Sequence, residues 1–328
     1  EHDPELYMSK VSAVPWQGLE VSCDEWLKML DINFDRNEEL IYSFQTFCGY
    51  TLSGSVEEQK FAYLHGPSNG GKSATADVVL SILGIDEYAT RAPVETFLAQ
   101  RNQEHPTMMH SLAGARMILS EEPARGQRWN ESRMRSFTGE SSYSSRRIRG
   151  NPETHRIVGK LWFTANHKPI VEDSSNAFWR RLAIFPFNHV ISEKERVPRI
   201  QDKIFVDEGS GVLAWMYRGY QNWRREGFKP TSEMLTIVNE YKSDMDTFSE
   251  FVTTYIVDEE GTSVGAQDLY NKYFDWCAQN NMRAMNCRVF PAEMQEHSFK
   301  RRRVGGGNRW LDIRLRNDMD GPSNKEEE

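Results

Sequence analysis

Apolar residues recur along this chain with two spacings, and each spacing predicts a different element. Between residues 22 and 50 they recur every three or four positions, which predicts helices with one apolar face. Three apolar runs of strand length, at 60–66, 116–122 and 160–166, end in polar residues or glycine and predict buried strands. Helical patterns separate these runs. Strands that alternate with helices predict an α/β fold with a parallel central sheet covered on both faces.

The part of the chain after Phe187 predicts helices and then a second, smaller unit. A polar stretch predicts a linker, and helical spacing follows it at 211–225 and 231–241. Three further helices are expected at 248–256, 266–279 and 289–297. Two strands around three consecutive glycines come after them. Three helices followed by a basic hairpin is the order of a winged-helix domain.

The polar loop after the first predicted strand has the spacing of a phosphate-binding loop. It matches G-x-x-x-x-G-K-[ST], with a helix predicted over 72–83 behind it. Glycines let backbone N–H groups turn toward phosphate oxygens, and the helix dipole favours an anion there. We expect Lys72 to contact the β- and γ-phosphates of a nucleoside triphosphate and Ser73 to bind Mg²⁺. The expected nucleotide-binding residues are Gly66, Pro67, Ser68, Asn69, Gly70, Gly71, Lys72, Ser73 and Ala74.

Polar residues also end the next two predicted strands. Glu121 and Glu122 follow the run MILS, and Asn166 ends the third strand. A nucleotide hydrolase needs a carboxylate for the metal and a group that orients the attacking water. We expect Glu121 to bind Mg²⁺, directly or through water, and Glu122 to polarise the water. Asn166 can hydrogen-bond the water or the γ-phosphate without adding charge.

Two consecutive arginines, Arg180 and Arg181, lie inside an otherwise apolar segment. Placing guanidinium groups in apolar surroundings is costly unless they have a defined anionic partner. One interpretation is a buried salt bridge within the chain. The other is an arginine finger that enters the ATP site of a neighbouring subunit.

Charge is distributed unevenly along the chain. There are 48 acidic residues against 40 Lys and Arg, a net charge of −8, which by itself argues against a nucleic-acid partner. However, residues 125–160 and residues 283–316 each contain nine Lys or Arg against three acids. Two basic islands in an acidic chain suit contact with a polyanion, with solvated surface as the plain alternative.

The order of these motifs resembles that of the superfamily 3 helicases of viruses, phages and plasmids. The segments GPSNGGKS, MILSEE, KLWFTANHKP and FWRRLAIFPF are most similar to the helicase module at the C-terminus of phage and plasmid primases and primase-polymerases. The resemblance is specific over residues 60–187. It implies an AAA+ core, ATP and Mg²⁺ as cofactors, a hexameric ring with ATP sites between subunits, and 3′-to-5′ translocation on single-stranded DNA.

The resemblance also implies a role for each motif residue. The implied assignments are Lys72 and Ser73 to Walker A, Glu121 and Glu122 to Walker B, Asn166 to sensor 1, and Arg180 or Arg181 to the finger. Many relatives have an aspartate in the Walker B pair where this chain has two glutamates. The division of roles between the two acids is therefore open.

In this family a β-hairpin between Walker B and sensor 1 lines the channel of the ring and grips DNA. Residues 144–159 fall in that interval, and their Gly-Asn-Pro-Glu segment predicts a hairpin tip. The expected DNA-contacting residues are Arg147, Arg149, His155 and Arg156. Six such hairpins would bind a strand without sequence preference and more weakly as salt rises.

The second basic island falls on the predicted winged-helix unit. Lys300 to Arg303 and Arg309 are candidates for contacts with duplex phosphates. Winged folds also bind proteins, so a protein-protein role is the alternative.

Cysteine usage and the chain ends bear on compartment and partners. No apolar run approaches the roughly 20 residues that span a bilayer, so we expect a cytoplasmic protein without membrane partners, in the host cytoplasm if a phage encodes it. The cysteines are scattered as reduced core thiols would be, and Cys277, Cys287 and His297 lack the short pairs of structural zinc sites. The chain begins with Glu1, which suggests a piece of a longer polypeptide, and the family resemblance implies a primase or polymerase domain upstream.

These inferences predict five parts in one replication protein. They are an N-terminal helical segment at 1–58, the ATPase core at 59–190, a helical linker or lid at 191–245, the winged-helix-like domain at 246–317 and a disordered tail at 318–328. The predicted function is an ATP-dependent DNA helicase motor. The alternative is an ATP-gated initiator or scaffold that binds DNA without unwinding it. A small-molecule kinase is disfavoured by the motif order and the basic hairpin.

Overall fold

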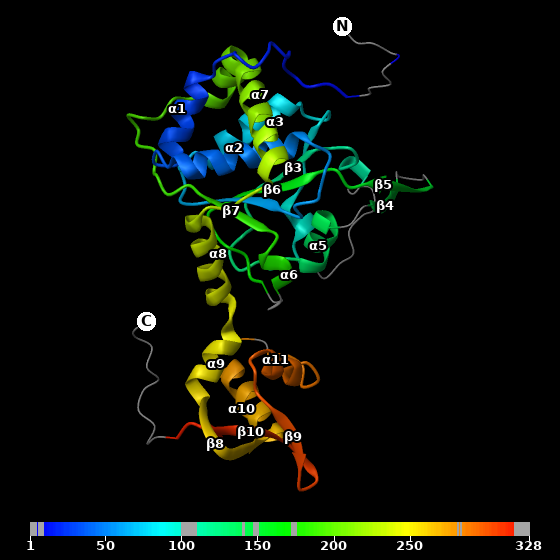
Figure 1. Cartoon of the computed structure of the whole chain (residues 1–328), viewed down its shortest axis with the longest axis vertical. Helices are drawn as coiled ribbons and strands as arrows, with labels where there is room; N and C mark the ends of the chain where they lie inside the picture. The colour runs from blue at the N-terminus through cyan, green and yellow to red at the C-terminus, as the bar shows by residue number, and fades with distance from the viewer. Residues whose placement is uncertain are drawn as a thin grey trace. The chain divides into compact units, whose positions relative to one another are not determined.

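The computed structural model describes residues 5, 10–99, 110–139, 142–146, 151–171, 176–280, 282 and 284–317 (Figure 1). The chain separates into two compact units, Glu1–Met245 and Asp246–Glu328. No helix in this described part combines the length and the apolar character of a membrane span.

A five-stranded parallel sheet forms the centre of the first unit. In spatial order its strands are β2 (Ala89–Arg91), β3 (Met117–Ser120), β6 (Lys160–Ala165), β1 (Phe61–His65) and β7 (Leu182–Pro186). Strand β1 lies between β6 and β7, with Tyr63 opposite Phe163 on one side and Ile184 on the other. The predicted α/β fold with a parallel sheet is confirmed, and it is consistent with a P-loop NTPase core. Strands β2 and β7 add to the three that the apolar runs predict.

Helices cover both faces of this sheet (Figure 1). One face packs against α1 (Asp24–Asn33), α2 (Glu38–Leu52), α3 (Lys72–Leu83) and α7 (Ile200–Glu226), and the other against α5 (Glu131–Gly139), α6 (Asn176–Trp179) and α8 (Ser232–Met245). Alternate residues of β1 point to opposite faces. Ala62 and Leu64 belong to the first core, whereas Phe61 and Tyr63 belong to the second. Both faces are buried, so the strands are almost continuously apolar.

Helix α7 differs from its sequence prediction because it begins earlier. The helix predicted over 211–225 extends from Ile200 to Glu226, so the end of the expected linker is helical. Ile204 in this added part is fully buried. Helix α7 also approaches α2 very closely, since a Cβ on Gly49 would lie 1.9 Å from the backbone nitrogen of Tyr220. This close packing holds α7 against the core along its length.

The second unit contains three helices and a three-stranded antiparallel sheet. Its elements in chain order are α9 (Thr247–Tyr255), β8 (Ile256–Gly265), α10 (Ala266–Gln279), α11 (Phe290–Glu296), β9 (Arg301–Val304) and β10 (Gly307–Leu315). The strands pair in the order β8-β10-β9. Phe251, Leu269 and Trp310 are fully buried between helices and sheet. This order and pairing form a winged-helix arrangement.

Strand β8 is absent from the sequence prediction. Only Ile256 and Val264 of its ten residues are buried, and four consecutive residues in its middle are exposed. A strand with so few buried residues lacks the strict alternation by which strands are recognised. Its pairing with β10, for example Val264 opposite Trp310, defines it instead.

Candidate functional site

The loop between β1 and α3 curls tightly around its own glycines. Gly71 caps α3 with a φ of +82°, a left-handed conformation that favours glycine. A Cβ on Gly71 would lie 2.4 Å from Oδ1 of Asn33, and one on Gly66 would lie 2.1 Å from the carbonyl oxygen of Phe187. Larger residues therefore fit at neither position without a shift. The G-x-x-x-x-G-K-S spacing produces the strand, loop and helix that it predicts.

The ammonium group of Lys72 lies inside this loop. Lys72 is only 7% exposed, and its Nζ donates to the carbonyl oxygens of Gly66 (2.9 Å) and Pro67 (2.6 Å) and to Oδ1 of Asn166 (2.7 Å). Burial lowers the pKa of Lys72, and the carboxylate of Glu122 partly opposes this shift. Three oxygen acceptors around one ammonium hold the lysine where the helix begins.

Asn166 connects Lys72 to one of the two predicted acids. Its backbone N–H donates to Oε1 of Glu122 (2.8 Å), and its Nδ2 donates to Oε2 of the same carboxylate (2.9 Å). Strands β3, β6 and β1 are neighbours, so their carboxyl ends bring these three side chains together. The structure thus forms a continuous series of hydrogen bonds from Lys72 through Asn166 to Glu122.

Glu121 lies apart from these hydrogen-bonded side chains. Its side chain is 81% exposed and forms an ion pair with Nη1 of Arg91 (3.3 Å). Arg91 also donates to Oδ1 of Asp77 (2.6 Å), and burial raises the pKa of that carboxyl. Sequence reasoning missed Asp77 and Arg91. Asp77 lies four residues after Ser73 on α3, a spacing that places both on one helix face and could have indicated it.

The two consecutive arginines also have opposite environments. Arg181 is 7% exposed, its Nη1 donates to the carbonyl oxygen of Ala177 (2.5 Å), and its Nε has no hydrogen-bond partner. Burial, and then the charges of Arg180 and Arg135, lower the pKa of Arg181. Within the described residues it forms no ion pair, so the structure shows no internal salt bridge for it. Arg180 is exposed; its backbone oxygen accepts from Nζ of Lys60 (2.6 Å), and its backbone N–H donates to the carbonyl oxygen of Asn176 (3.0 Å).

A pocket of about 680 Å³ opens beside the loop. It lies between residues 69–74, helix α1 and the segment 191–201. Its apolar side chains are Met29, Ile32, Ile191, Val197, Pro198 and Ile200. The loop motif indicates only the wall formed by residues 69–74, because the other walls come from two separate parts of the chain. Such a mixture of apolar walls and a polar loop is typical of a small-molecule site.

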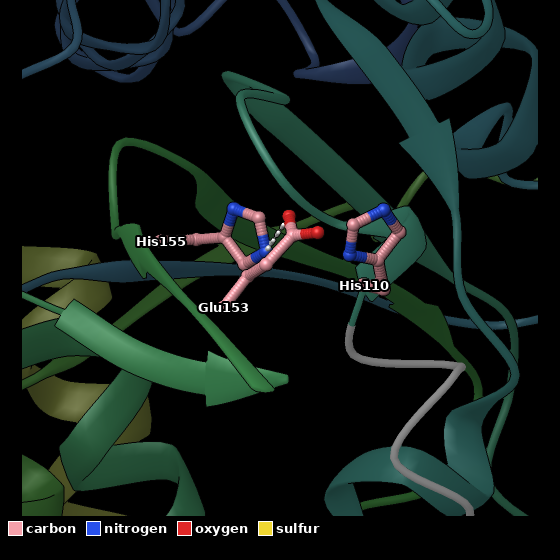
Figure 2. Close-up of side chains that lie close together, drawn as sticks. All are labelled: His110, Glu153 and His155. Atoms are coloured by element: carbon pink, nitrogen blue, oxygen red, sulfur yellow. Dashed lines mark ion pairs between the residues drawn. The ribbon is translucent and has the colours of Figure 1, made fainter. Parts of the chain in front are cut away.

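A hairpin is present at the predicted place, as β4 (Ser142–Arg146) paired with β5 (Pro152–Arg156), but Pro152 and Glu153, which were expected at its tip, lie within β5. Arg147 and Arg149 lie outside the described residues. Arg156 is exposed. The side chain of His155 is 19% exposed, and its ring lies toward His110, 5.0 Å between centroids (Figure 2). Of the predicted DNA contacts that are described, only Arg156 has an exposed side chain.

The basic residues of the second unit differ in the same way. Arg301, Arg302 and Arg303 are all exposed on β9. Arg309 is engaged within the unit, where its Nε donates to Oγ of Ser263 (2.8 Å) and its Nη2 to the carbonyl oxygen of Ser263 (2.7 Å). The accessible residues of this basic island are therefore the three arginines of β9 together with Lys300 and Arg288, which are also exposed.

His65, at the end of β1, is held without charge next to the loop. Burial, and then the nearby charges of Lys168 and Lys72, lower the pKa of His65 to about 4. Its ring stacks on Tyr63 at a centroid distance of 6.2 Å. A neutral ring here avoids a further positive charge beside Lys72.

Comparison with known proteins relates the chain to viral sequences. Residues 243–312 match the family described as Poxvirus D5 protein-like. The chain is 24% identical over 258 residues to the putative helicase L207/L206 of Acanthamoeba polyphaga mimivirus, covering 72% of this chain and 26% of that protein. It is 23% identical over 252 residues to the putative helicase 022R of Frog virus 3 (isolate Goorha), covering 70% and 26%. The match thus spans about a quarter of the length of these relatives.

A solved structure shares the fold. The C-terminal region of NrS-1, residues 305–718, superimposes with a TM-score of 0.56 at 12% identity. The superposition covers 92% of this chain and 79% of the NrS-1 region. The chain is therefore similar in sequence to viral putative helicases and similar in fold to this region of NrS-1.

The lowered pKa of His65 predicts a pH-dependent stability. Between its ordinary pKa of 6.5 and the folded value of about 4, the unfolded chain binds the proton and the folded chain does not. The contribution of neutral His65 to the free energy of unfolding is thus complete above pH 6.5 and is lost as the pH falls toward 4. Between these pH values we expect wild type to lose about 1–2 kcal/mol more free energy of unfolding than His65→Gln, after allowing for partial solvent exposure. Urea unfolding at several pH values measures this difference, and parallel curves for the two proteins would contradict it.

Proposed function

We propose that this chain is the ATP-driven motor module of a viral or plasmid-type DNA helicase of superfamily 3. The observation that supports this most directly is the series of hydrogen bonds from Lys72 through Asn166 to Glu122 at the carboxyl ends of three adjacent strands. Ligands bind at this edge of open α/β sheets. The similarity to two viral putative helicases supports the choice of a helicase among the enzymes that use such a loop.

The nucleotide would lie along the loop with its base in the adjacent pocket. When phosphates arrive, the Nζ of Lys72 would exchange its three protein acceptors for β- and γ-phosphate oxygens. The apolar side chains of Met29, Ile32 and Val197 would cover the faces of the base. ATP is then the expected ligand, with its phosphates at the start of α3.

Two exposed oxygen donors would hold Mg²⁺. Ser73 is exposed in the first turn of α3, and Glu121 is exposed at the end of β3. Hydroxyl and carboxylate oxygens are the ligand types that Mg²⁺ takes, so these residues fit the ion. Bound there, Mg²⁺ neutralises phosphate charge. The ion pair between Arg91 and Glu121 would have to open for this carboxylate to bind the ion.

Hydrolysis would use Glu122 and Asn166. The carboxylate of Glu122 would accept a hydrogen bond from a water, whose oxygen attacks the γ-phosphorus while the bond to the β,γ-bridging oxygen breaks. Asn166 already donates to Glu122 and accepts from Lys72, so it would orient both groups. Such positioning accounts for most of the catalysis of phosphoryl transfer.

The ring, its polarity and its DNA grip extend the proposal beyond one subunit. Arg180 would act as the finger in the site of the next subunit, because it is exposed whereas Arg181 is buried. Arg147, Arg149 and Arg156 would contact single-stranded DNA inside a hexamer that moves 3′ to 5′. A primase or polymerase region in the same polypeptide is part of this proposal, since the viral relatives are about four times as long as the matched region.

Glu122→Gln tests the water-orienting role. The amide keeps the size of the side chain and loses the negative charge that polarises water, so we expect ATP to bind normally and hydrolysis to slow by about 100-fold or more. Equilibrium binding of a fluorescent ATP analogue and steady-state phosphate release measure the two effects. An equal loss of binding would instead place Glu122 with the metal. Glu121→Gln is the matched variant, for which weakened Mg²⁺-dependent binding is expected.

Stimulation of ATP hydrolysis by single-stranded DNA tests the motor. We expect wild type to be stimulated strongly at low salt and progressively less as salt rises. The triple variant Arg147→Ala, Arg149→Ala, Arg156→Ala should retain basal hydrolysis and lose the stimulation. The triple alanine variant of Arg301, Arg302 and Arg303 removes the same amount of charge from the second unit. This control variant should retain the stimulation of hydrolysis by DNA. Hydrolysis that is indifferent to DNA in wild type would favour the initiator or the kinase alternative.

Mixed oligomers test the finger. Arg180→Ala subunits should be inactive alone, because their sites lack a cation for the transition state. Mixing them with inactive Lys72→Ala subunits should restore part of the activity, since some interfaces then combine an intact loop with an intact finger. Arg181→Ala is expected to lower the unfolding temperature and to give no rescue. Rescue by Arg181→Ala alone would reverse the two assignments.

A further inference from the structure

Three side chains that could ligate a metal ion converge at the base of the hairpin. His110, Glu153 and His155 each offer one ligand atom, and these atoms all lie within 4.8 Å of one another. Figure 2 shows the two imidazole rings on either side of the Glu153 carboxylate, with all three side chains directed toward one another. The proposed nucleotide site uses none of these residues.

The hairpin presents two of the three groups on one face. Glu153 and His155 are two residues apart on β5, and such residues share a face of a strand. His110 belongs to the segment that leads into β3, more than forty residues earlier in the chain. Packing of the ring of His155 on Tyr143, at a centroid distance of 5.7 Å, helps to keep His155 turned toward His110. The site therefore forms only when the hairpin lies against the core.

The protein itself leaves one ligand atom of this cluster unsatisfied. Nε2 of His155 is buried and has no hydrogen-bond partner, and the nearest carboxylate oxygen, Oε2 of Glu153, is 3.7 Å away. A buried polar atom without a partner normally costs free energy. A metal ion bound to this nitrogen would remove that cost.

The spacing of the ligand atoms is near that of a zinc site. With bonds of 2.0–2.2 Å, ligand atoms in a tetrahedral zinc site lie about 3.4 Å apart, so the present separations of up to 4.8 Å would close to a zinc site through small side-chain rotations. Two imidazole nitrogens and one carboxylate are a common zinc ligand set, with water in the fourth position.

We propose that His110, Glu153 and His155 bind a divalent transition-metal ion, Zn²⁺ in the first instance. The ion would fasten the β4–β5 hairpin to the segment that enters β3. Imidazole ligands favour Zn²⁺, Co²⁺ and Ni²⁺ over Mg²⁺ and Ca²⁺, so the site would be chemically distinct from the Mg²⁺ site of the nucleotide. Metal binding here is independent of the proposed function.

One consequence does rest on the proposed function. Strand β3 ends directly before Glu121 and Glu122, so an ion between its leading segment and the hairpin would join the DNA grip to the acidic pair. The metal ion would then strengthen the stimulation of hydrolysis by DNA without contacting the nucleotide or the DNA.

Metal titration of the whole chain tests the site. Protein stripped with a chelator and freed of any affinity tag is titrated with Zn²⁺ against a chromophoric chelator, in a Cys287→Ser background that removes the exposed thiol. We expect one equivalent of Zn²⁺ to bind with a dissociation constant of about 1 μM or lower. His110→Gln, Glu153→Gln and His155→Gln should each weaken this binding by about tenfold or more.

A matched control variant and a structural readout make the test specific. His297→Gln removes a histidine that also lies near a glutamate, 3.8 Å from Glu293, but that belongs to no group of three possible metal ligands among the described residues, so Zn²⁺ affinity should not change. Hydrogen exchange in β4 and β5 should slow when Zn²⁺ is added to wild type and should not respond in His155→Gln. Neither measurement uses ATP or DNA, so failure here is separate from failure of the proposed function.

The opposite results would overturn the proposal. Stoichiometric Zn²⁺ binding that is absent from the Cys287→Ser background, or that is as tight in all three ligand variants as in the protein with the intact cluster, would show that the cluster holds no ion. Unchanged hydrogen exchange in wild type on addition of Zn²⁺ would do the same. The cluster would then be a contact between the Glu153 carboxylate and the ring of His155, formed without metal.

Discussion

The buried ammonium group of Lys72 is the interaction around which the loop edge of the first unit is arranged. An ammonium inside a protein is tolerated only when its donors are satisfied. Here the acceptors are the carbonyl oxygens of Gly66 and Pro67 and the side-chain oxygen of Asn166. The first two require the tight curl of the glycine-rich loop, and the third requires β6 to lie beside β1. One charge therefore ties the loop, the first turn of α3 and the central sheet into a single arrangement.

The sheet extends this constraint to the acids. Parallel strands end at the same edge, so the residues after β3, β6 and β1 meet there regardless of their distance in sequence. Glu122 reaches Asn166 across this edge, whereas Glu121 turns outward to Arg91. The two glutamates are adjacent in the chain and have different partners. The two glutamates therefore occupy different places: Glu122 lies next to the lysine, and Glu121 lies at the exposed rim. This difference is a structural basis for giving them different roles.

The same division into an inner and an outer residue applies to the arginines. Arg181 lies in the core without an ion pair among the described residues, and Arg180 points to solvent. A buried guanidinium that lacks a carboxylate is held by backbone oxygen, as at Ala177, and by packing. The exposed neighbour remains available for a second molecule. Adjacent identical residues can thus serve structure and contact separately, because their side chains leave the backbone in different directions.

The sequence by itself determined the elements whose signals are local. The loop spacing and the helix over 72–83 agree with the structure, as do the three apolar strands and the helix over 266–279, because turn chemistry and the periodicity of burial are written in consecutive residues. The sequence did not predict strand β8 or the early start of α7, since few residues of β8 are buried and the start of α7 lies in a polar stretch. Only the tertiary structure decided which of two adjacent glutamates or arginines faces inward, formed the apolar pocket from three segments and brought His110 to Glu153 and His155. These features depend on packing between distant parts of the chain, and a pattern of neighbouring residues contains no information about which distant residue will lie opposite.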